Sequence, residues 1–137
     1  MDTITQEERT LGGLSHLGVI FGWIGLAFQV ILLIVYMPKS KYVASHAKQA
    51  LGLWVIWYLA KLAIGGLTGG VGVWAAMNPM RVMSGAFLGP LLFGVMAMLA
   101  LGVGVLVLVI LAMIKGFNGQ SHRYPLVGDL IASIGGE

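Results

Sequence analysis

Residues 91–114 read LLFGVMAMLALGVGVLVLVILAMI, an apolar run without a single charged side chain. At about 1.5 Å of rise per residue, a helix over this run exceeds the roughly 30 Å hydrocarbon thickness of a bilayer. Two similar apolar segments precede it, so we expect transmembrane spans over residues 11–37, 47–77 and 83–114. The sequence therefore predicts an all-α integral membrane protein with three transmembrane helices, folded as a single membrane domain over residues 1–137.

The composition of the whole chain agrees with a lipid environment. Its 137 residues are 58% hydrophobic and 9% charged, with a mean hydropathy of +0.94, whereas soluble domains carry about a quarter charged residues. The absence of cysteine excludes disulfides, thiolate metal sites and a cysteine nucleophile. The first residues lack the basic segment and the cleavage site of a secretory signal, so we expect the first apolar segment to remain in the mature protein.

Short polar signals mark the expected helix ends. Thr5, with Glu8 three residues later, has the form of a capping box. Pro38 should end the first span, and Ser45 is a suitable N-cap for the second. The third segment is longer than a bilayer requires, so we expect Pro90 near the first turn of its helix.

The C-terminal residues predict a turn and a short fourth helix. Asn118–Gly119 is a turn signal after the third span. Over residues 125–134 the apolar side chains fall on one face of a helix. This amphipathic helix either lies in the membrane interface or docks against the bundle. Its apolar residues are Leu126, Val127, Leu130, Ile131 and Ile134.

The distribution of Lys and Arg predicts an orientation. Three crossings place the N-terminus and the second connection on one side, with Arg9 and Arg81. Because positive residues stay in the cytoplasm, we expect the N-terminus outside and the C-terminus on the cytoplasmic side. The net charge of +3 favours anionic lipid headgroups as partners, and no nucleic acid is expected. The first connection and the tail carry Lys39, Lys41, Lys48, Lys115 and Arg123.

Glycine pairs four residues apart are the most regular pattern in the apolar segments. In lipid, small residues let helix backbones approach closely and gain dispersion energy. We interpret the pairs as helix-packing faces, used either within the bundle or against another chain, and the alternative is a path for a substrate. They are Gly18 with Gly22, Gly65 with Gly69, Gly66 with Gly70, and Gly85 with Gly89.

Two polar residues lie deep in the predicted spans. Lys61 has no acidic residue at a comparable depth, and a charge there is costly. Its side chain could reach an interface, lose its proton, bind a lipid or ligand anion, or meet a partner's carboxylate, and Trp57 one turn earlier could receive it as a cation–π partner. Gln29 is expected to make a hydrogen bond between helices.

The histidines suggest a haem site, but the predicted topology argues against it. We expect His16 at the outer end of the first span and His46 at the inner end of the second, at opposite membrane faces. We therefore expect neither a cofactor nor a metal site. The carboxylates lie near the chain ends and no catalytic motif is present, so we expect no catalytic residues and no enzyme activity.

Two stretches resemble a known family. Residues 45–52, SHAKQALG, and residues 118–126, NGQSHRYPL, resemble the Tic-twenty-like small membrane proteins, as does Leu14–Leu17. That family includes a chloroplast inner-envelope import component and bacterial and archaeal relatives of unknown function. The resemblance covers about residues 8–131 and implies a helical membrane protein that associates with itself or with other membrane proteins. Together with the lack of a secretory signal at the first residues, it implies a multi-pass protein of the bacterial plasma (inner) membrane. The sequence departs from the family pattern between Gly65 and Gly89.

The predicted topology places several polar residues together on the inner face. This cluster either clamps the tail onto the first connection or docks a partner. We expect a non-enzymatic structural or accessory subunit or scaffold of a membrane assembly, and the alternative is a homo-oligomeric channel or translocation-type pore. The cluster residues are His46, Lys48, Gln49, Asn118, Arg123 and Tyr124.

Overall fold

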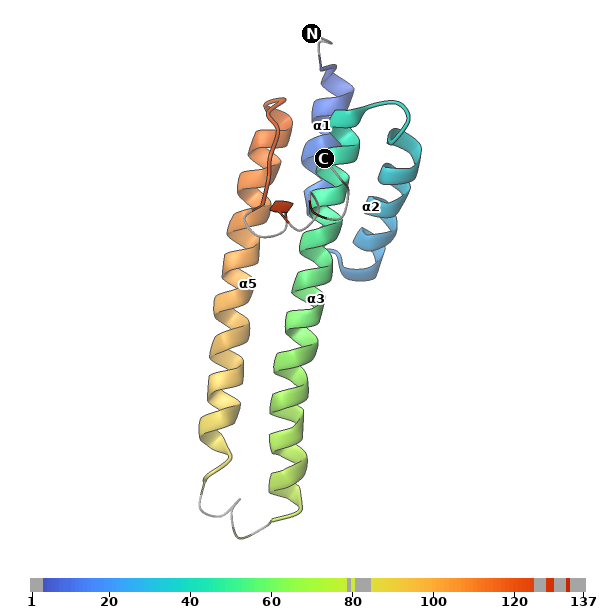
Figure 1. The fold of residues 1–137 in the computed structure, drawn as a ribbon. Helices are drawn as coiled ribbons and strands as arrows, with labels where there is room; N and C mark the ends of the chain where they lie inside the picture. The colour runs from blue at the N-terminus through green and yellow to red at the C-terminus, as the bar shows by residue number, and fades with distance from the viewer. Residues whose placement is uncertain (1–3, 79, 81–84, 125–127, 130–132, 134–137) are drawn as a thin grey trace. The chain divides into compact units, whose positions relative to one another are not determined.

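The chain is helical over most of the residues that the computed structural model describes, and these contain no β-strand (Figure 1). The all-α prediction therefore holds for them. The described residues are 4–78, 80, 85–124, 128, 129 and 133. The helices are α1 (Gln6–Ser15), the 3-10 helix η1 (His16–Val19), α2 (Gly22–Tyr36), α3 (Lys41–Ala76) and α5 (Leu88–Phe117).

The chain divides into two compact units. Unit 1 comprises Met1–Ile56 and Leu106–Glu137, and unit 2 comprises Trp57–Val105. Unit 1 thus holds the N-terminal helices, the first part of α3 and the last part of α5. Unit 2 holds the rest of these two long helices and their connection.

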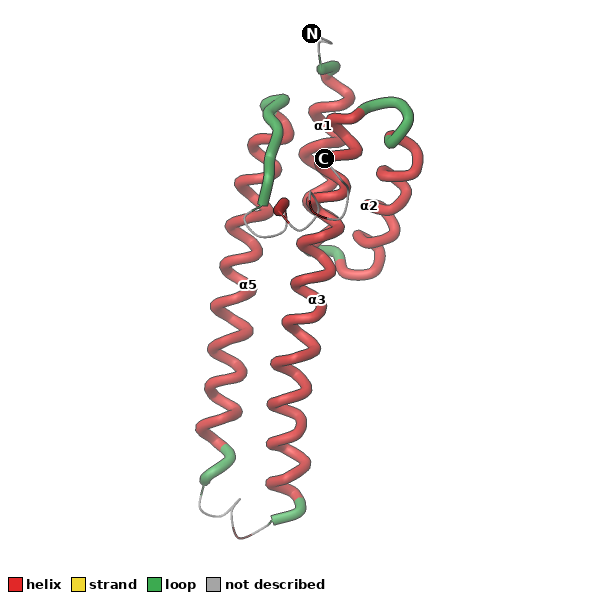
Figure 2. Tube along the Cα trace, viewed as in Figure 1, coloured by secondary structure: helices red, strands yellow, loops and turns green. Residues whose placement is uncertain are grey.

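The first apolar segment forms a helical hairpin, so the prediction of one span over residues 11–37 is wrong. A tight turn separates η1 from α2, and Gly22 has a φ of +60° there, a conformation that glycine adopts without steric cost. Figure 2 shows the two loops that flank α2. The 15 residues of α2 extend about 22 Å, which is short of a bilayer's hydrocarbon thickness.

Within the described residues, two helices are long and apolar enough to cross a membrane, where the sequence predicted three. They are α3 with 36 residues and α5 with 30 residues. The predicted span over residues 47–77 corresponds to α3. Ser45 is not its N-cap, because the helix already begins at Lys41 and the Ser40 Oγ accepts a hydrogen bond from the Val43 N–H at 3.3 Å. The hydroxyl that caps this helix therefore precedes Lys41.

The third predicted span, over residues 83–114, corresponds to α5. Pro90 lies in the first turn of α5, as predicted, since the helix begins at Leu88. Residues 81–84 lie outside the described residues, and so does most of the C-terminal helix predicted over residues 125–134.

The predicted capping box at the start of α1 is confirmed. The Thr5 Oγ1 accepts a hydrogen bond from the Glu8 N–H at 3.2 Å, and the Glu8 carboxylate accepts one from the Thr5 N–H at 2.8 Å. Hydrogen bonds from Ser40 and then from Thr5 hold the pKa of Glu8 below its usual range. The Tyr36 hydroxyl donates to the Glu7 carboxylate at 2.8 Å. The start of α1, the end of α2 and the start of α3 therefore lie together.

In unit 1, α1 packs against both long helices through adjacent glycines. A Cβ built on Gly12 would lie 2.8 Å from the Tyr42 ring of α3, and one on Gly13 would lie 2.6 Å from the Phe117 ring of α5. The Tyr42 hydroxyl donates to the Gly116 carbonyl of α5 at 2.6 Å. The N-terminal helix thus meets the C-terminal end of α5. The prediction that the two chain ends lie on opposite sides of the membrane depended on three crossings. With two candidate crossings, that argument no longer applies.

Candidate functional site

The hairpin turn brings His16 into the interior of unit 1. The α1 helix ends at Ser15, and the tighter η1 begins with His16, whose side chain is fully buried. The turn is anchored to α3, because the Trp54 Nε1–H donates to the Gly22 carbonyl at 3.0 Å. Since His46 lies on α3 near the contact with Gly12, the two histidines face the same interior.

A helix-ending turn directs the C-terminal segment back along α5 (Figure 1). The Gly119 N–H donates to the Gly116 carbonyl, and the Gln120 N–H donates to the Lys115 carbonyl at 2.9 Å. Gly119 has a φ of +71°, so the end of α5 has the geometry of a Schellman motif. The predicted turn at Asn118–Gly119 is confirmed. It allows Tyr124 to reach the same interior as the two histidines.

A continuous chain of hydrogen bonds joins the three segments. The Tyr124 hydroxyl lies 2.9 Å from the His16 Nδ1, the His16 Nε2 lies 2.9 Å from the His46 Nδ1, and the His46 Nε2 lies 3.1 Å from the Gln120 carbonyl oxygen. We call these four groups the histidine chain. Tyr124, His16 and His46 are each at most 1% exposed, so water does not compete for these bonds.

The hydrogen positions in the neutral histidine chain follow from its ends. A carbonyl oxygen only accepts, so the His46 Nε2 carries the hydrogen and its Nδ1 accepts from the His16 Nε2–H. The His16 Nδ1 then accepts from the Tyr124 hydroxyl. Burial raises the pKa of the Tyr124 hydroxyl, which therefore keeps its hydrogen. One set of tautomers satisfies every group in the chain.

A third histidine lies beside the chain. The His122 ring centroid is 4.6 Å from the Tyr124 ring and 6.1 Å from the His16 ring, edge to face in both contacts. Both His122 ring nitrogens are buried without a hydrogen-bond partner among the described residues. Burial, and secondarily the charge of Lys115, lowers the pKa of His122. This imidazole is therefore neutral near pH 7.

The predicted separation of His16 and His46 is wrong, because it assumed that residues 11–37 form one crossing. The hairpin returns the chain to the level at which α3 begins, and the two rings form a hydrogen bond. All four of their ring nitrogens have partners, so neither histidine offers an unengaged ligand atom. Among the described residues, no group of three or more His, Cys, Asp or Glu side chains could hold a metal ion.

The structure brings together three of the six residues of the predicted inner-face cluster. His46 and Tyr124 both belong to the histidine chain, and the Gln49 Oε1 accepts a hydrogen bond from the Tyr124 N–H at 3.1 Å. The others lie apart from this contact. Lys48 is half-buried and Asn118 is exposed, while Arg123 forms an exposed ion pair with Asp129 at 3.2 Å.

The two polar residues predicted at depth have different surroundings. The Gln29 Nε2–H donates to the Ser15 carbonyl at 3.3 Å, which links α2 to α1, and its Oε1 is buried without a partner among the described residues. Lys61 lies in unit 2, with its Nζ 5.2 Å from the Trp57 ring centroid and 5.8 Å from that of Tyr58. Of the surroundings considered for Lys61, the structure shows the cation–π contact with Trp57.

The predicted glycine pairs lie in different environments. A Cβ built on Gly18 would lie 2.7 Å from both the Gly25 carbonyl oxygen and the Gln29 Nε2, so Gly18 meets α2. Gly85 meets only Leu88 at 3.6 Å. The remaining glycines of the predicted pairs have no described neighbour within 4 Å of such a Cβ. These are Gly22, Gly65, Gly66, Gly69, Gly70 and Gly89.

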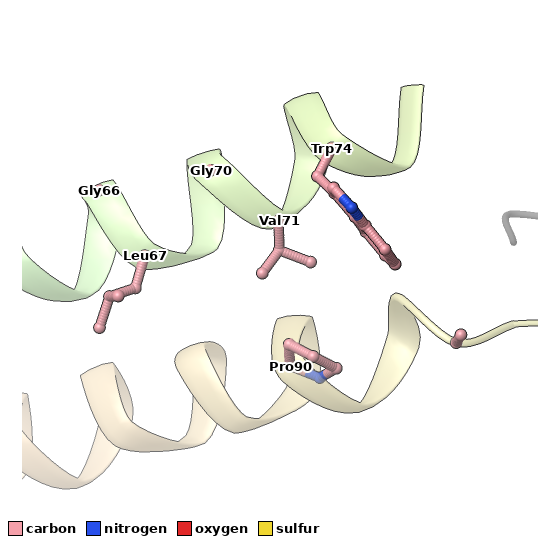
Figure 3. A pocket seen from close by; sticks show the side chains of 7 residues that line it. Gly66, Leu67, Gly70, Val71, Trp74 and Pro90 are labelled. Carbon is pink, nitrogen blue, oxygen red and sulfur yellow. The ribbon is translucent and has the colours of Figure 1, made fainter. Parts of the chain in front are cut away.

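In unit 2 an open hollow of about 500 Å³ lies over some of these glycines. Figure 3 shows Leu67, Val71 and Trp74 of α3 opposite Pro90 of α5. Gly66, Gly70 and Ala86 complete the lining, in which the indole N–H of Trp74 is the one polar side-chain group among the described residues. The hollow therefore offers little that would orient a polar ligand.

Sequence reasoning missed several residues of unit 1 that hold the site together. Gly12, Gly13 and Gly116 permit the close approach of α1 to the long helices, but none belongs to a glycine pair four residues apart. His16 was placed at the wrong level, and His122 was given no role. The polar residues Ser15 and His16 in an otherwise apolar segment are the signal that the segment has a buried polar interior.

Comparison with known families identifies the chain. The model of the magnetosome magnetite crystal formation protein family (MamF/MmsF) matches residues 7–131. The chain therefore belongs to this family, and the Tic-twenty-like resemblance was wrong, because the two are different families. The stretch that carried the resemblance at residues 118–126 includes the turn at Asn118–Gly119, which many helix ends require. No curated protein and no solved structure matches the chain.

Proposed function

We propose that this member of the magnetosome magnetite crystal formation family is a non-enzymatic structural or accessory subunit of a magnetosome membrane assembly. Unit 1 is a packed polar anchor, and the helices of unit 2 associate with a second membrane chain, either another copy or a different protein. The family supports the setting. The association is supported by one observation, the open glycine face of unit 2.

That face combines glycines with protruding apolar side chains. Gly65, Gly66, Gly69 and Gly70 leave the backbone of α3 uncovered by described residues of this chain. Leu67, which lies between these glycines on α3, is 73% exposed. Lipid tails solvate such side chains as well as a protein does, but they do not pack against a bare helix backbone as closely as another helix does. The glycines therefore favour helix association over lipid.

The association can be tested by filling the face. In Gly66→Leu/Gly70→Leu the new side chains should keep a second helix away, so the particle mass in mild detergent or nanodiscs should fall to that of one chain. Gly104→Leu is the matched control, because Gly104 lies on α5 of unit 2 and has nothing within 4 Å of a built Cβ. Native mass spectrometry gives the masses.

Three results would count against this function. A wild-type protein with the mass of one chain in nanodiscs would remove the association. Equal masses for the double variant and the control would mean that the chains associate through another surface. A closed ring that conducts ions in liposomes would favour a pore.

The charges support an orientation that differs from the one expected for three crossings. Six of the eight Lys and Arg residues belong to unit 1, and Arg81 follows α3 in the connection to α5. With α3 and α5 as the two crossings, the positive-inside rule places both ends of unit 1 on the cytoplasmic side, facing anionic headgroups. The six are Arg9, Lys39, Lys41, Lys48, Lys115 and Arg123.

Cysteine labelling tests the orientation cleanly, because the chain has no cysteine. In closed vesicles with the cytoplasmic face outward, an impermeant maleimide should label Gln6→Cys and Ser121→Cys directly. Asn78→Cys should react only after the vesicles are opened. Labelling of Gln6→Cys and Ser121→Cys from opposite sides would restore three crossings.

A further inference from the structure

We propose that the histidine chain is a proton-sensitive latch, which holds the segment Gln120–Tyr124 on η1 and α3 while His16, His46 and the adjacent His122 are neutral and releases it when these histidines gain a proton. The inference does not depend on the proposed association of unit 2, since every group involved lies in unit 1.

The latch joins segments that lie far apart in the sequence. Tyr124 and His16 are 108 positions apart, and Tyr124 and Gln49 are 75 positions apart. The segment Gln120–Tyr124 is held at both ends, at the Gln120 carbonyl by His46 and at Tyr124 by His16 and Gln49. The two histidines therefore hold both ends of the segment, and Gln49 adds one further bond at Tyr124.

An added proton disrupts the single arrangement of hydrogens that satisfies the chain. If His46 is protonated, both of its ring nitrogens donate, so the His16 Nε2 must accept and its Nδ1 must carry the hydrogen. The His16 Nδ1–H then points at the Tyr124 oxygen, and the Tyr124 hydroxyl loses its acceptor. Protonation of His16 has the same consequence at Tyr124. Either step also leaves a positive charge in a buried site.

The charged and titratable groups around the chain do not compensate that positive charge. His16 and His46 each face His122 from the tail, and His122 faces Lys115 of α5. The Tyr42 ring lies 4.6 Å from the His46 ring, and Tyr42 faces both Arg9 and Glu8 of α1. The Glu8 carboxylate already accepts hydrogen bonds from Thr5.

The direction of the pH effect follows from a comparison of the His122 pKa in the closed and the released states. Burial lowers the pKa of His122 in the closed state, whereas a histidine in a released, hydrated segment has a pKa of about 6.5. Opening therefore takes up protons. The closed state therefore keeps its full stability above about pH 6.5 and loses stability as the pH falls below that value. For each proton taken up, the open-to-closed ratio rises by about tenfold per pH unit.

A distance measurement on the full chain reports the state of the latch. Ser45 of α3 and Ser121 of the tail are both exposed, so Ser45→Cys/Ser121→Cys can carry two spin labels in nanodiscs. At pH 8 the double electron–electron resonance trace should show one narrow distance distribution. At pH 5 a second, broader and longer distribution should appear and vanish again on return to pH 8.

Two variants and a matched control connect the transition to the chain. Tyr124→Phe removes the hydroxyl that His16 accepts from, so the segment should open at a higher pH. His122→Gln removes one titrating group, so the transition should become less steep. Tyr36→Phe removes a hydroxyl that bonds to Glu7 instead, and it should leave the midpoint unchanged.

Other outcomes would overturn the proposal. One is an identical distance distribution from pH 8 to pH 5. Another is a transition whose midpoint and steepness are the same in Tyr124→Phe, His122→Gln and the wild type, because carboxylates elsewhere would then be responsible. A segment that opens as the pH rises would also refute it, since the sign would be reversed.

Discussion

The two units use the same residue, glycine, in opposite ways. In unit 1, Gly12, Gly13 and Gly116 are covered by neighbouring helices, so that a Cβ on any of them would overlap a side chain or backbone. In unit 2, Gly65 and Gly69 sit on a similarly apolar helix with nothing described near them. A glycine count therefore cannot distinguish a packed interface within the chain from a face left for another molecule. The contacts of each glycine in the folded chain make that distinction.

The units also differ in their polar interiors. The buried polar side chains among the described residues all belong to unit 1, and several are joined by hydrogen bonds across helices. In unit 2, the Thr68 hydroxyl donates to the Ile64 and Gly65 carbonyls of its own helix, and the Lys61 Nζ lies over aromatic rings. Hydrogen bonds between distant segments specify one arrangement, so unit 1 is the part whose tertiary structure should be most sensitive to substitution.

Adding one methyl group should give the largest contrast between the units. In Gly25→Ala the new Cβ meets the Gly18 carbonyl across the hairpin, and two backbones must separate. The free energy of unfolding should fall by about 3 kcal/mol. Gly104→Ala on α5 of unit 2 should raise it by up to about 1 kcal/mol, because alanine favours the helix and has open space. Thermal unfolding in detergent, followed by circular dichroism, measures both, and similar effects would erase the contrast.

Breaking the histidine chain should have the next largest effect. His16→Ala leaves the Tyr124 hydroxyl and the His46 Nδ1 without partners in a buried site. Each unsatisfied group costs about 1 kcal/mol or more, so unfolding should become easier by about 2 to 3 kcal/mol. Thr68→Ala in unit 2 should change stability by less than about 0.5 kcal/mol. A near-neutral His16→Ala would mean that water replaces the lost bonds.

A pair of matched Tyr→Phe substitutions should sharpen the comparison within unit 1. Tyr124→Phe removes a buried hydroxyl that donates to His16, and it should cost about 1 kcal/mol at pH 8. Tyr36→Phe removes an exposed bond to Glu7, whose loss should be within about 0.5 kcal/mol. Chemical denaturation of both variants in the same detergent gives the difference. Equal costs would show that burial does not strengthen the bond.

The smallest effect is expected at the exposed end of the tail. Arg123 pairs with Asp129, with 58% and 79% of their side chains exposed, so water and salt screen the pair. Arg123→Ala should lower stability by less than about 0.5 kcal/mol. Hydrogen exchange at residues 118–124 should stay close to wild type at pH 8. A large increase in exchange there would make Arg123, and not the histidine chain, the main clamp of the tail.

Local signals in the sequence predicted the pieces of the fold better than their arrangement. The capping box at Thr5 and Glu8, the turn at Asn118–Gly119 and the place of Pro90 in the first turn of α5 depend on residues within a few positions of one another, and all three are confirmed. The N-cap at Ser45 was wrong because Ser40, five residues earlier, performs the same chemistry at an earlier helix start.

The number of crossings and the candidate site required the tertiary structure. The apolar length of residues 11–37 suits one span, and only the turn at Gly22, anchored by Trp54, reveals two short helices. Because of that turn, His16 lies beside His46 and not at the opposite membrane face, where the three-span topology had placed it. Every inference from the three-span topology changed with it, including the separation of the histidines and of the chain ends.

The sequence by itself determined that this protein is built of apolar helices, because side-chain composition alone sets the preference for lipid over water and the caps and turns are local. Only the tertiary structure decided which glycines are covered and which polar groups meet. Those contacts join residues up to 108 positions apart, and their energy depends on distances that no local pattern encodes.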